Sequence, residues 1–367
     1  MAKRGRKGSL IALALGAAAV WVAKDIPRQM GAKATGARLA RMQASQQFAD
    51  GKFRNALPAA EIPASSIPGM ALAAMRGREA RHPHQPIPVV TPPTGADAEG
   101  LHVTWFGHSS AMVEIEGKRV LLDPVWSDRC SPSRLGGPKR LHEPPVPLRE
   151  LPPLDAVLIS HDHYDHLDME TIQNLVDLQA APFLVPLGVG AHLERWGVPA
   201  TRIVELDWDE THRVAGLDFI ATPARHFSGR GFTRDETLWT SWVINGPTRK
   251  VFYSGDTGYF PGFAEIGERH GPFDVTLVQV GAYGDAWPDI HMLPEDGVAT
   301  HVDVRGGLMI PVHWATFNLA LHDWSEPADR TWREAKARDV RLAIPRPGER
   351  VDVDNPPAVD GWWQQIA

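Results

Sequence analysis

Residues 160–168 are Ser160-His161-Asp162-His163-Tyr164-Asp165-His166-Leu167-Asp168. Three histidines and one ligand-capable aspartate stand within six positions of this run, in the pattern His-x-His-x-Asp-His. The mainly apolar stretch 155–160 predicts a buried strand, and the pattern over 168–180 predicts a helix with Asp168 as its N-cap. Imidazole and carboxylate groups on a loop backed by a strand suit a borderline-soft divalent metal. A solvated polar loop is the alternative interpretation.

Further metal-capable side chains stand just past later apolar stretches, at His226, Asp256 and His313. Gly255 and Gly258 flank Asp256 and would let the backbone turn sharply there. Taken singly, each of these residues could be a structural, hydrogen-bonded one. Together with the first motif they supply seven candidate ligands, which are His161, His163, Asp165, His166, His226, Asp256 and His313.

Seven ligands are enough for two metal ions that each keep an open position, as catalytic sites do. The expected division places His161, His163 and His226 on one ion and Asp165, His166 and His313 on the other, with Asp256 as the bridge. A water between two such ions loses a proton near neutral pH and becomes a strong nucleophile. Because no cysteine stands at these positions, a hydrolytic Zn, Mn or Fe site is favoured over a purely structural zinc.

Composition excludes some functions. The hydrophobic content of 43% is ordinary for a globular protein, and the net charge of −6 gives no electrostatic case for a nucleic-acid partner. Cys130 is the only cysteine, so no intramolecular disulfide can form. The sequence therefore favours a folded enzyme that takes a small-molecule substrate.

The first residues predict membrane targeting. The apolar run 10–23 follows four basic residues, Lys3, Arg4, Arg6 and Lys7. This is the layout of a secretory signal or a short membrane anchor, although a spanning helix needs about 20 apolar residues. An amphipathic soluble helix is the alternative. We expect a membrane-associated or exported protein of a bacterial-type cell, with residues 1–30 as the signal or anchor.

The remaining chain divides at about residue 100. Residues 31–100 contain a Pro-rich, aperiodic stretch and predict an extension that wraps onto the main body, and residues 101–367 predict one folded domain. Strands are expected at 102–106, 111–116, 119–123, 155–160, 183–187, 202–206, 212–222, 238–244, 250–254, 273–280, 307–312 and 340–344. Helices are expected at 168–180 and near 261–270, 294–304 and 327–338. This order predicts a mixed α/β sandwich with helices over the sheet faces.

The ligand pattern resembles the metallo-β-lactamase superfamily. Finer motifs resemble its N-acyl-phosphatidylethanolamine-hydrolysing phospholipase D group. They include Asp50-Gly-Lys-Phe-Arg-Asn55, Trp105-Phe-Gly-His-Ser-Ser110, Leu122-Asp-Pro-Val125, Gly137-Pro-Lys-Arg140, Gly255-Asp-Thr-Gly-Tyr259 and His313-Trp-Ala-Thr-Phe317. The resemblance implies an αβ/βα four-layer sandwich, here with an N-terminal extension, two Zn²⁺ ions on the seven ligands, and phosphodiester hydrolysis of a phospholipid-like substrate. The membrane-directed N-terminus supports the same substrate class.

Asp165 and His291 are the expected catalytic residues. His291 matches a histidine that lines the family's active site, where it could donate a proton to the leaving group or hold a phosphate. Leu293 and Arg225 depart from the family pattern, which usually has a polar residue and often has Gln at these positions. A lactone or amide hydrolase of the same superfamily is the alternative function, and a non-hydrolytic iron protein is a further one.

Several other residues leave two interpretations open. Asp123 either orients a ligand histidine or caps a turn before Pro124, and His108 is expected to make structural hydrogen bonds near the site. Four tryptophans could wall a lipid-facing groove, but core packing is favoured: Trp239, Trp242, Trp287 and Trp314. The other histidines are expected to be structural or solvated: His82, His84, His142, His192, His212, His270, His301 and His322.

Overall fold

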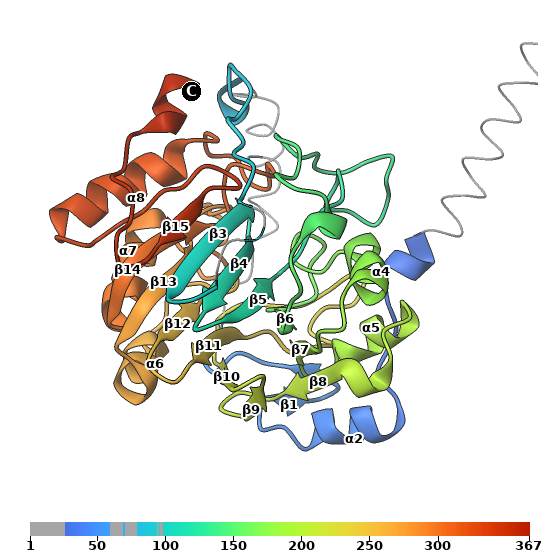
Figure 1. The fold of residues 1–367 in the computed structure, drawn as a ribbon. Coiled ribbons are helices and arrows are strands. Elements are labelled where there is room, and N and C mark those ends of the chain that lie inside the picture. Colours follow the sequence, from blue (N-terminus) through green and yellow to red (C-terminus); the bar gives the residue numbers. More distant parts are fainter. Residues whose placement is uncertain (1–25, 59–68, 70–78, 94, 96–97) are drawn as a thin grey trace, which may run out of the picture.

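Two mixed β-sheets carry helices on their outer faces (Figure 1). The structure is a computed structural model that describes residues 26–58, 69, 79–93, 95 and 98–367. One sheet has the order β15 (Arg350–Asp352), β3 (Leu101–Gly107), β4 (Ser110–Ile115), β5 (Lys118–Leu122), β6 (Ala156–Leu158), β7 (Phe183–Pro186) and β8 (Ile203–Leu206). The other has the order β14 (Gly306–Val312), β13 (Phe273–Gln279), β12 (Lys250–Tyr253), β11 (Ser241–Asn245), β10 (Leu217–Thr222) and β9 (Thr211–Val214).

The inner strands are buried on both faces, whereas the edge strand β9 is mostly exposed. Leu121 and Leu122 are neighbours on β5, yet they belong to different clusters of buried side chains. Leu122 packs in the cluster that joins the two sheets, with Trp242 of β11 among its members. Leu121 belongs to the cluster on the outer face of the first sheet, with Ile172. Successive side chains of a strand point to opposite faces, so the inner strands lie between two packed layers.

Five helices form the outer layers. The cluster outside the first sheet includes residues of α4 (Met169–Leu178) and α5 (Gly190–Arg195). The helices α6 (Gly262–His270), α7 (Pro294–Asp303) and α8 (Glu326–Ala337) cover the second sheet, where α7 contacts β13 and β14. Asp168 caps α4 as predicted, because its side chain accepts a hydrogen bond from the Glu170 backbone N–H. The predicted αβ/βα four-layer sandwich is confirmed.

Two predicted strands are wrong. The stretch 212–222 is not one strand but the antiparallel pair β9 and β10, because Ala215 and Gly216 both adopt positive φ and form a tight turn. The stretch 340–344 contains only an isolated bridge between Met309 and Leu342. The strand β15 and the short helix α5 were not predicted. A three-residue strand and a six-residue helix carry too few periods to show in the sequence.

The N-terminal part of the described chain lies against the main body. It forms α2 (Gly36–Gln43) and the small hairpin of β1 (Phe48–Ala49) and β2 (Lys52–Phe53). Phe53 packs beside Trp239, and Arg38 forms ion pairs with Glu194 and Glu205. The predicted signal or anchor falls mostly on residues 1–25, which lie outside the described residues. Over the part of the chain that the structure does describe, no helix combines the length and apolarity needed to cross a membrane.

Candidate metal centre

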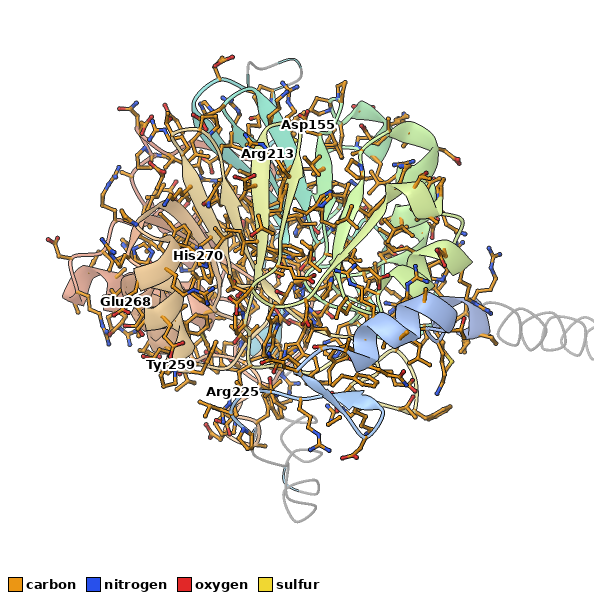
Figure 2. All side chains as sticks on the ribbon, turned by 90° about the horizontal axis from the view of Figure 1, so that it is seen from below. Asp155, Arg213, Arg225, Tyr259, Glu268 and His270 are labelled. Atoms are coloured by element: carbon orange, nitrogen blue, oxygen red, sulfur yellow. The ribbon has the colours of Figure 1, made fainter. Side chains whose placement is uncertain are left out.

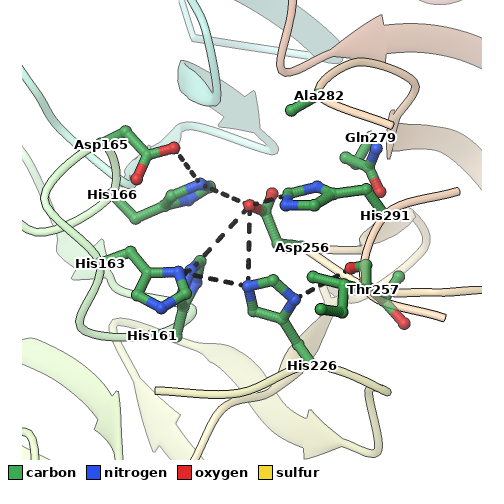
Figure 3. Close-up of polar contacts among 12 residues, drawn as sticks. His161, His163, Asp165, His166, His226, Asp256, Thr257, Gln279, Ala282 and His291 are labelled. Atoms are coloured by element: carbon green, nitrogen blue, oxygen red, sulfur yellow. Dashed lines mark hydrogen bonds and ion pairs between the residues drawn. The ribbon is translucent and has the colours of Figure 1, made fainter. Parts of the chain in front are cut away.

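The seven predicted ligands meet at one edge of the two sheets. Figure 3 shows six of them, which are His161, His163, Asp165, His166, His226 and Asp256. Four of the seven come from the loop between β6 and α4, and the others follow β10, β12 and β14. Asp256 reaches the centre because Gly255 before it adopts φ +54° and packs tightly on Ser160. A Cβ on Gly255 would lie 2.7 Å from that of Ser160, so a larger residue would displace one of the two ligand-bearing loops.

One set of ligand atoms consists only of imidazole nitrogens, and we call it the three-histidine group. His161 Nε2 lies 2.8 Å from His163 Nδ1, which lies 3.3 Å from His226 Nε2. His226 Nδ1 donates to the Ile290 carbonyl at 3.0 Å, so its Nε2 is left with a lone pair. Burial lowers the pKa of all three rings. Three neutral imidazoles whose nitrogens face one another are suited to holding a metal ion.

The second set, which we call the mixed group, consists of Asp165, His166 and His313 together with Asp256. Asp256 Oδ2 lies 2.9 Å from His313 Nε2 and 3.1 Å from His166 Nε2. The same oxygen is 4.0 Å from both His161 Nε2 and His226 Nε2. Burial alone would raise the pKa of Asp256, but the rings of His166 and His313 hold it well below its usual range. A charged carboxylate oxygen therefore lies between the two groups.

These residues fit a bound metal. His166 Nε2 and Asp256 Oδ1 are buried without a hydrogen-bond partner, although buried polar atoms are normally satisfied. The ligand atoms of His161, His163 and His226 lie within 4.8 Å of one another, and so do those of His161, His166 and Asp256. Imidazole nitrogen and carboxylate oxygen without thiolate is a donor set used by Zn²⁺, Mn²⁺ and Fe²⁺.

Asp123 orients the ligand His166 and does not serve only to cap the turn before Pro124. Its Oδ2 accepts a hydrogen bond from His166 Nδ1 at 2.7 Å, so His166 presents Nε2 to the centre. The Ser160 backbone N–H donates to its Oδ1 at 2.7 Å, and the Tyr253 hydroxyl donates to its Oδ2. Asp123, Ser160 and Tyr253 are all fully buried. The role of Tyr253 was missed, because nothing in the apolar strand β12 distinguishes it from a core residue.

His108 makes structural hydrogen bonds, as predicted, and it also touches the mixed group. Its Nε2 lies 2.8 Å from Asp165 Oδ2. Its carbonyl accepts from the His313 backbone N–H at 2.9 Å, and its own N–H donates to Thr316 Oγ1 at 2.6 Å. His108 thus joins two ligands, Asp165 and His313, that are distant in sequence.

The three-histidine group is held by a buried arginine that the sequence did not reveal. The Arg230 guanidinium donates through Nη1 to the carbonyls of Asp162 and Leu167, both at 2.7 Å. In return, Asp162 Oδ1 accepts from the Gly229 N–H at 2.7 Å. These contacts join the loop of His161 and His163 to the loop that follows His226. The motif 224–231, which resembles the same family group, includes Arg230, but nothing in it indicates this role, because the partners of Arg230 are backbone carbonyls from elsewhere in the chain.

Residues of the N-terminal extension complete this support. The side chain of Asn55 brackets His226, with Oδ1 accepting from the His226 N–H at 3.0 Å and Nδ2 donating to its carbonyl at 2.8 Å. The Ala32 N–H donates to His192 Nδ1 at 2.9 Å, and His192 Nε2 lies 3.3 Å from Asp162 Oδ2. His192 therefore has the predicted structural role, but it acts beside the ligand loop.

His291 lies beside the seven ligands, and it forms with His226 and Asp256 a further group whose candidate ligand atoms lie within 4.8 Å of one another. Its Nδ1 is 3.9 Å from Asp256 Oδ2, and burial lowers its pKa to about 3. The ring is therefore neutral at pH 7 and presents one N–H donor. Its loop is fixed by Arg225, whose Nη1 lies 2.6 Å from Asp289 Oδ1. The same nitrogen lies 3.4 Å from the carbonyl of Tyr259, and Figure 2 labels Arg225 and Tyr259 on the same side of the molecule.

The tryptophans do not form a shared groove. Trp239, Trp242 and Trp314 are at most 2% exposed and belong to the core, so the favoured interpretation is confirmed for these three. Trp287 is only partly buried and donates to the Ala282 carbonyl at 2.9 Å. The packing of three of the four residues thus excludes a common aromatic wall.

A model of the β-lactamase superfamily domain matches residues 118–314, more than half of the chain. The chain belongs to the metallo-β-lactamase superfamily. It is a metal-dependent hydrolase of this superfamily, as its ligand pattern predicted.

Two relatives place the chain more closely. An uncharacterized protein of Mycobacterium tuberculosis is 49% identical over 357 residues, which cover 95% of this chain and 96% of the relative. The N-acyl-phosphatidylethanolamine-hydrolyzing phospholipase D 1 of Caenorhabditis elegans is 34% identical over 267 residues, covering 69% of this chain and 75% of the relative.

Solved structures share the fold. The isothiocyanate hydrolase from Delia radicum gut bacteria superposes with a TM-score of 0.54 at 21% identity, over 68% of this chain and 98% of that one. The diiron β-hydroxylase CmlA of Streptomyces venezuelae gives 0.53 at 21% identity, over 69% of this chain and 53% of that one. At such identities the likeness extends to the fold alone.

Proposed function

We propose that this hydrolase is a phosphodiesterase of phospholipase D type that acts on N-acyl-phosphatidylethanolamine-like phospholipids with two Zn²⁺ ions. The observation that carries the proposal is the position of Asp256 Oδ2 between two ligand groups. A shared carboxylate offsets the repulsion between two cations. The 34% identity to the phospholipase D of Caenorhabditis elegans supports the substrate class.

In this proposal the three-histidine group holds one ion, and Asp165, His166 and His313 hold the other. A bound pair of such ions supplies a water of lowered pKa and neutralises charge on a phosphate. Water would add to phosphorus while the bond to the headgroup oxygen breaks, and one proton must reach that oxygen.

We infer that the neutral ring of His291 contacts the substrate, because it lies 3.9 Å from the shared Asp256 oxygen. Its N–H would donate a hydrogen bond to a phosphate oxygen or to the departing alcohol. Neighbouring Arg225 is engaged with Asp289 and with the Pro58 carbonyl. We assign Arg225 to holding the loop of His291 rather than to direct contact with the phosphate.

The N-terminal run 10–23 would place the enzyme at its substrate. Its apolar residues and the preceding basic ones support membrane association or export of the protein. A lipid-cleaving enzyme gains from such targeting because its substrate is confined to a bilayer.

An activity screen of the full-length protein tests the proposal. The protein is stripped of metal, reloaded with Zn²⁺, Mn²⁺ or Fe²⁺, and assayed on N-acyl-phosphatidylethanolamine, on bis(4-nitrophenyl) phosphate and on a lactone panel. We expect release of N-acylethanolamine with close to two Zn²⁺ per chain. Turnover of lactones without any phosphodiester cleavage would contradict the proposal, and so would binding of less than one metal ion per chain.

A further inference from the structure

Two loop tips carry the most exposed large hydrophobic side chains among the described residues. Phe232, in the loop 229–236, is fully exposed, and Leu135, in the loop 128–139, is 65% exposed. The next most exposed, Val302, reaches 47%. A single exposed apolar side chain is ordinary on a protein surface, so the significance of these two depends on what surrounds them.

Both loops border the same short segment, residues 26–34, which we call the N-terminal strap. A hollow of about 520 Å³ is lined by Met30 of the strap and by Phe232. A second hollow, of about 380 Å³, is lined by Gln29 of the strap and by Arg134. One hollow therefore lies between the strap and the Phe232 loop, and the other lies between the strap and the Leu135 loop.

The strap and the Phe232 loop are fixed to the body of the protein. Arg230 Nε donates to the Gln29 carbonyl at 2.8 Å, and Trp196 Nε1 donates to the Arg28 carbonyl at 2.7 Å. In Figure 1 the strap meets the molecule beside α4 and α5. The apolar run 10–23 precedes the strap by only two residues, so the chain leads from this run directly to the face that carries the two loops.

The same face is basic, although the whole chain carries a net charge of −6. Within the strap and the two loops, seven basic residues stand against three acidic ones. Three of the basic side chains form exposed ion pairs, which are Lys33 with Glu236, Lys139 with Asp128, and Arg134 with Glu170 of α4. Arg230 is buried, and the other basic residues are Arg28, Lys33, Arg129, Arg134, Lys139 and Arg234. The acidic residues are Asp128, Asp235 and Glu236. Apolar tips among basic side chains suit a surface of anionic lipids, which attracts lysine and arginine and accepts apolar groups below its headgroups.

We propose that the strap and the two loop tips form a docking surface for an anionic lipid bilayer, with Phe232 and Leu135 entering the headgroup boundary. The proposal rests on the proposed function for its assignment of a lipid substrate. A single weak membrane signal gives only reversible binding, and a second signal converts it to stable attachment. In this chain the run 10–23 is one signal and the docking surface is the other.

The docking surface also adjoins the metal-ligand loop. The Tyr164 hydroxyl donates to the Arg230 carbonyl at 2.6 Å, and the Tyr164 ring packs in a small cluster with Cys130. Arg230 belongs to the Phe232 loop and Cys130 to the Leu135 loop. A bilayer that contacts both tips would therefore lie beside the loop that bears His163 and Asp165.

Vesicle binding of the full-length, zinc-loaded protein tests the docking surface. Partitioning is measured on vesicles of phosphatidylcholine alone and on vesicles of two parts phosphatidylcholine to one part phosphatidylglycerol. The double variant Phe232→Ser/Leu135→Ser should bind both about tenfold more weakly, because two apolar side chains no longer enter the interface. The double variant Arg134→Gln/Arg234→Gln should lose about fivefold per arginine, on the anionic vesicles only.

Matched controls are Val302→Ser on α7 and Val89→Ser, which remove exposed side chains (47% and 41%) that line neither hollow. Both should bind vesicles as the wild type does. Cleavage of bis(4-nitrophenyl) phosphate should be unchanged in every variant. If it is absent even in the wild type, the proposed function fails while the vesicle result still decides the docking surface.

Two results would overturn the docking surface. One is wild-type partitioning of the Phe232→Ser/Leu135→Ser variant on both kinds of vesicle. The other is a wild-type dimer in light scattering that this variant converts to a monomer, since the two tips would then meet a second copy of the chain instead of lipid.

Discussion

The two ligand groups of the metal centre are supported by different parts of the molecule. The mixed group is held from the interior, where Asp123 and Tyr253 are fully buried between the sheets and fix His166. The three-histidine group is held from outside, by Arg230 of a surface loop and by Asn55 of the N-terminal extension. We infer that the core sets the first arrangement at folding, while the second depends on segments that dock onto that core.

Asp256 serves both ligand groups, so we expect its substitution to affect both metal ions rather than one. We expect Asp256→Ala to lower turnover of any substrate by more than about 10³-fold, since the charge between the two cations is lost. Metal content, measured by elemental analysis, should fall in both groups. A variant that retained two metals and near-normal turnover would contradict the bridging role.

His291 supports neither ligand group. Its substitution should therefore lower turnover without changing metal content. His291→Ala removes one hydrogen bond to a charged substrate, which predicts a loss of about 10- to 100-fold in kcat. Metal content should stay at the wild-type value. Unchanged steady-state kinetics would assign the ring to loop structure, and lost metal would assign it to the ligands.

Asp123 should affect the mixed group alone. In Asp123→Asn the oxygen that accepts from His166 Nδ1 is partly replaced by a donor, so His166 loses its fixed orientation. Loss of such a partner typically weakens metal binding about 10- to 100-fold. Competition with a chelator should show one weakened ion and one unchanged ion. Equal weakening of both would mean that the two groups share one support.

Substitution of Arg230 should instead weaken metal binding in the three-histidine group. Arg230→Ala frees the Asp162 and Leu167 carbonyls, and we expect the ion of the three-histidine group to bind about tenfold more weakly. Its defect in chelator competition should match that of His226→Ala rather than that of His313→Ala. Lys33→Ala, which removes an exposed ion pair with Glu236, is the control and should bind both ions normally.

Truncations of the N-terminus have the smallest expected effect. They show which N-terminal residues support the three-histidine group. Deletion of residues 1–25 keeps every strap contact, so metal content and cleavage of soluble phosphodiesters should be those of the full chain. Deletion of residues 1–34 removes the partners of Trp196, Arg230 and His192, and it should weaken only the three-histidine ion. If deletion of residues 1–25 already lowers the metal content, residues that precede the strap would have to support the metal centre.

Features specified by neighbouring residues could be predicted before the fold was known. The motif at 161–166 and the residues after later apolar stretches identified seven of the nine metal-capable side chains that the fold brings together; the other two are His108 and His291. The period of the apolar residues located most of the long elements, and Asp168 was recognised as a helix cap from its place before α4. These signals succeed because a strand, a helix and a cap are each specified by neighbouring residues.

The arrangement of these features around the metal centre follows from contacts that form only in the folded protein. These contacts place Asp256 Oδ2 between the two ligand groups, and they make Asp123 the partner of His166. Arg230 and Tyr253 support ligands through such contacts. In the sheet, residues 340–344 form no strand, whereas Arg350–Asp352 pairs with β3. Each of these features depends on contacts between residues far apart in the chain. Buried hydrogen bonds to backbone carbonyls, as Arg230 makes, leave no periodic trace in the sequence, so only the folded chain reveals them.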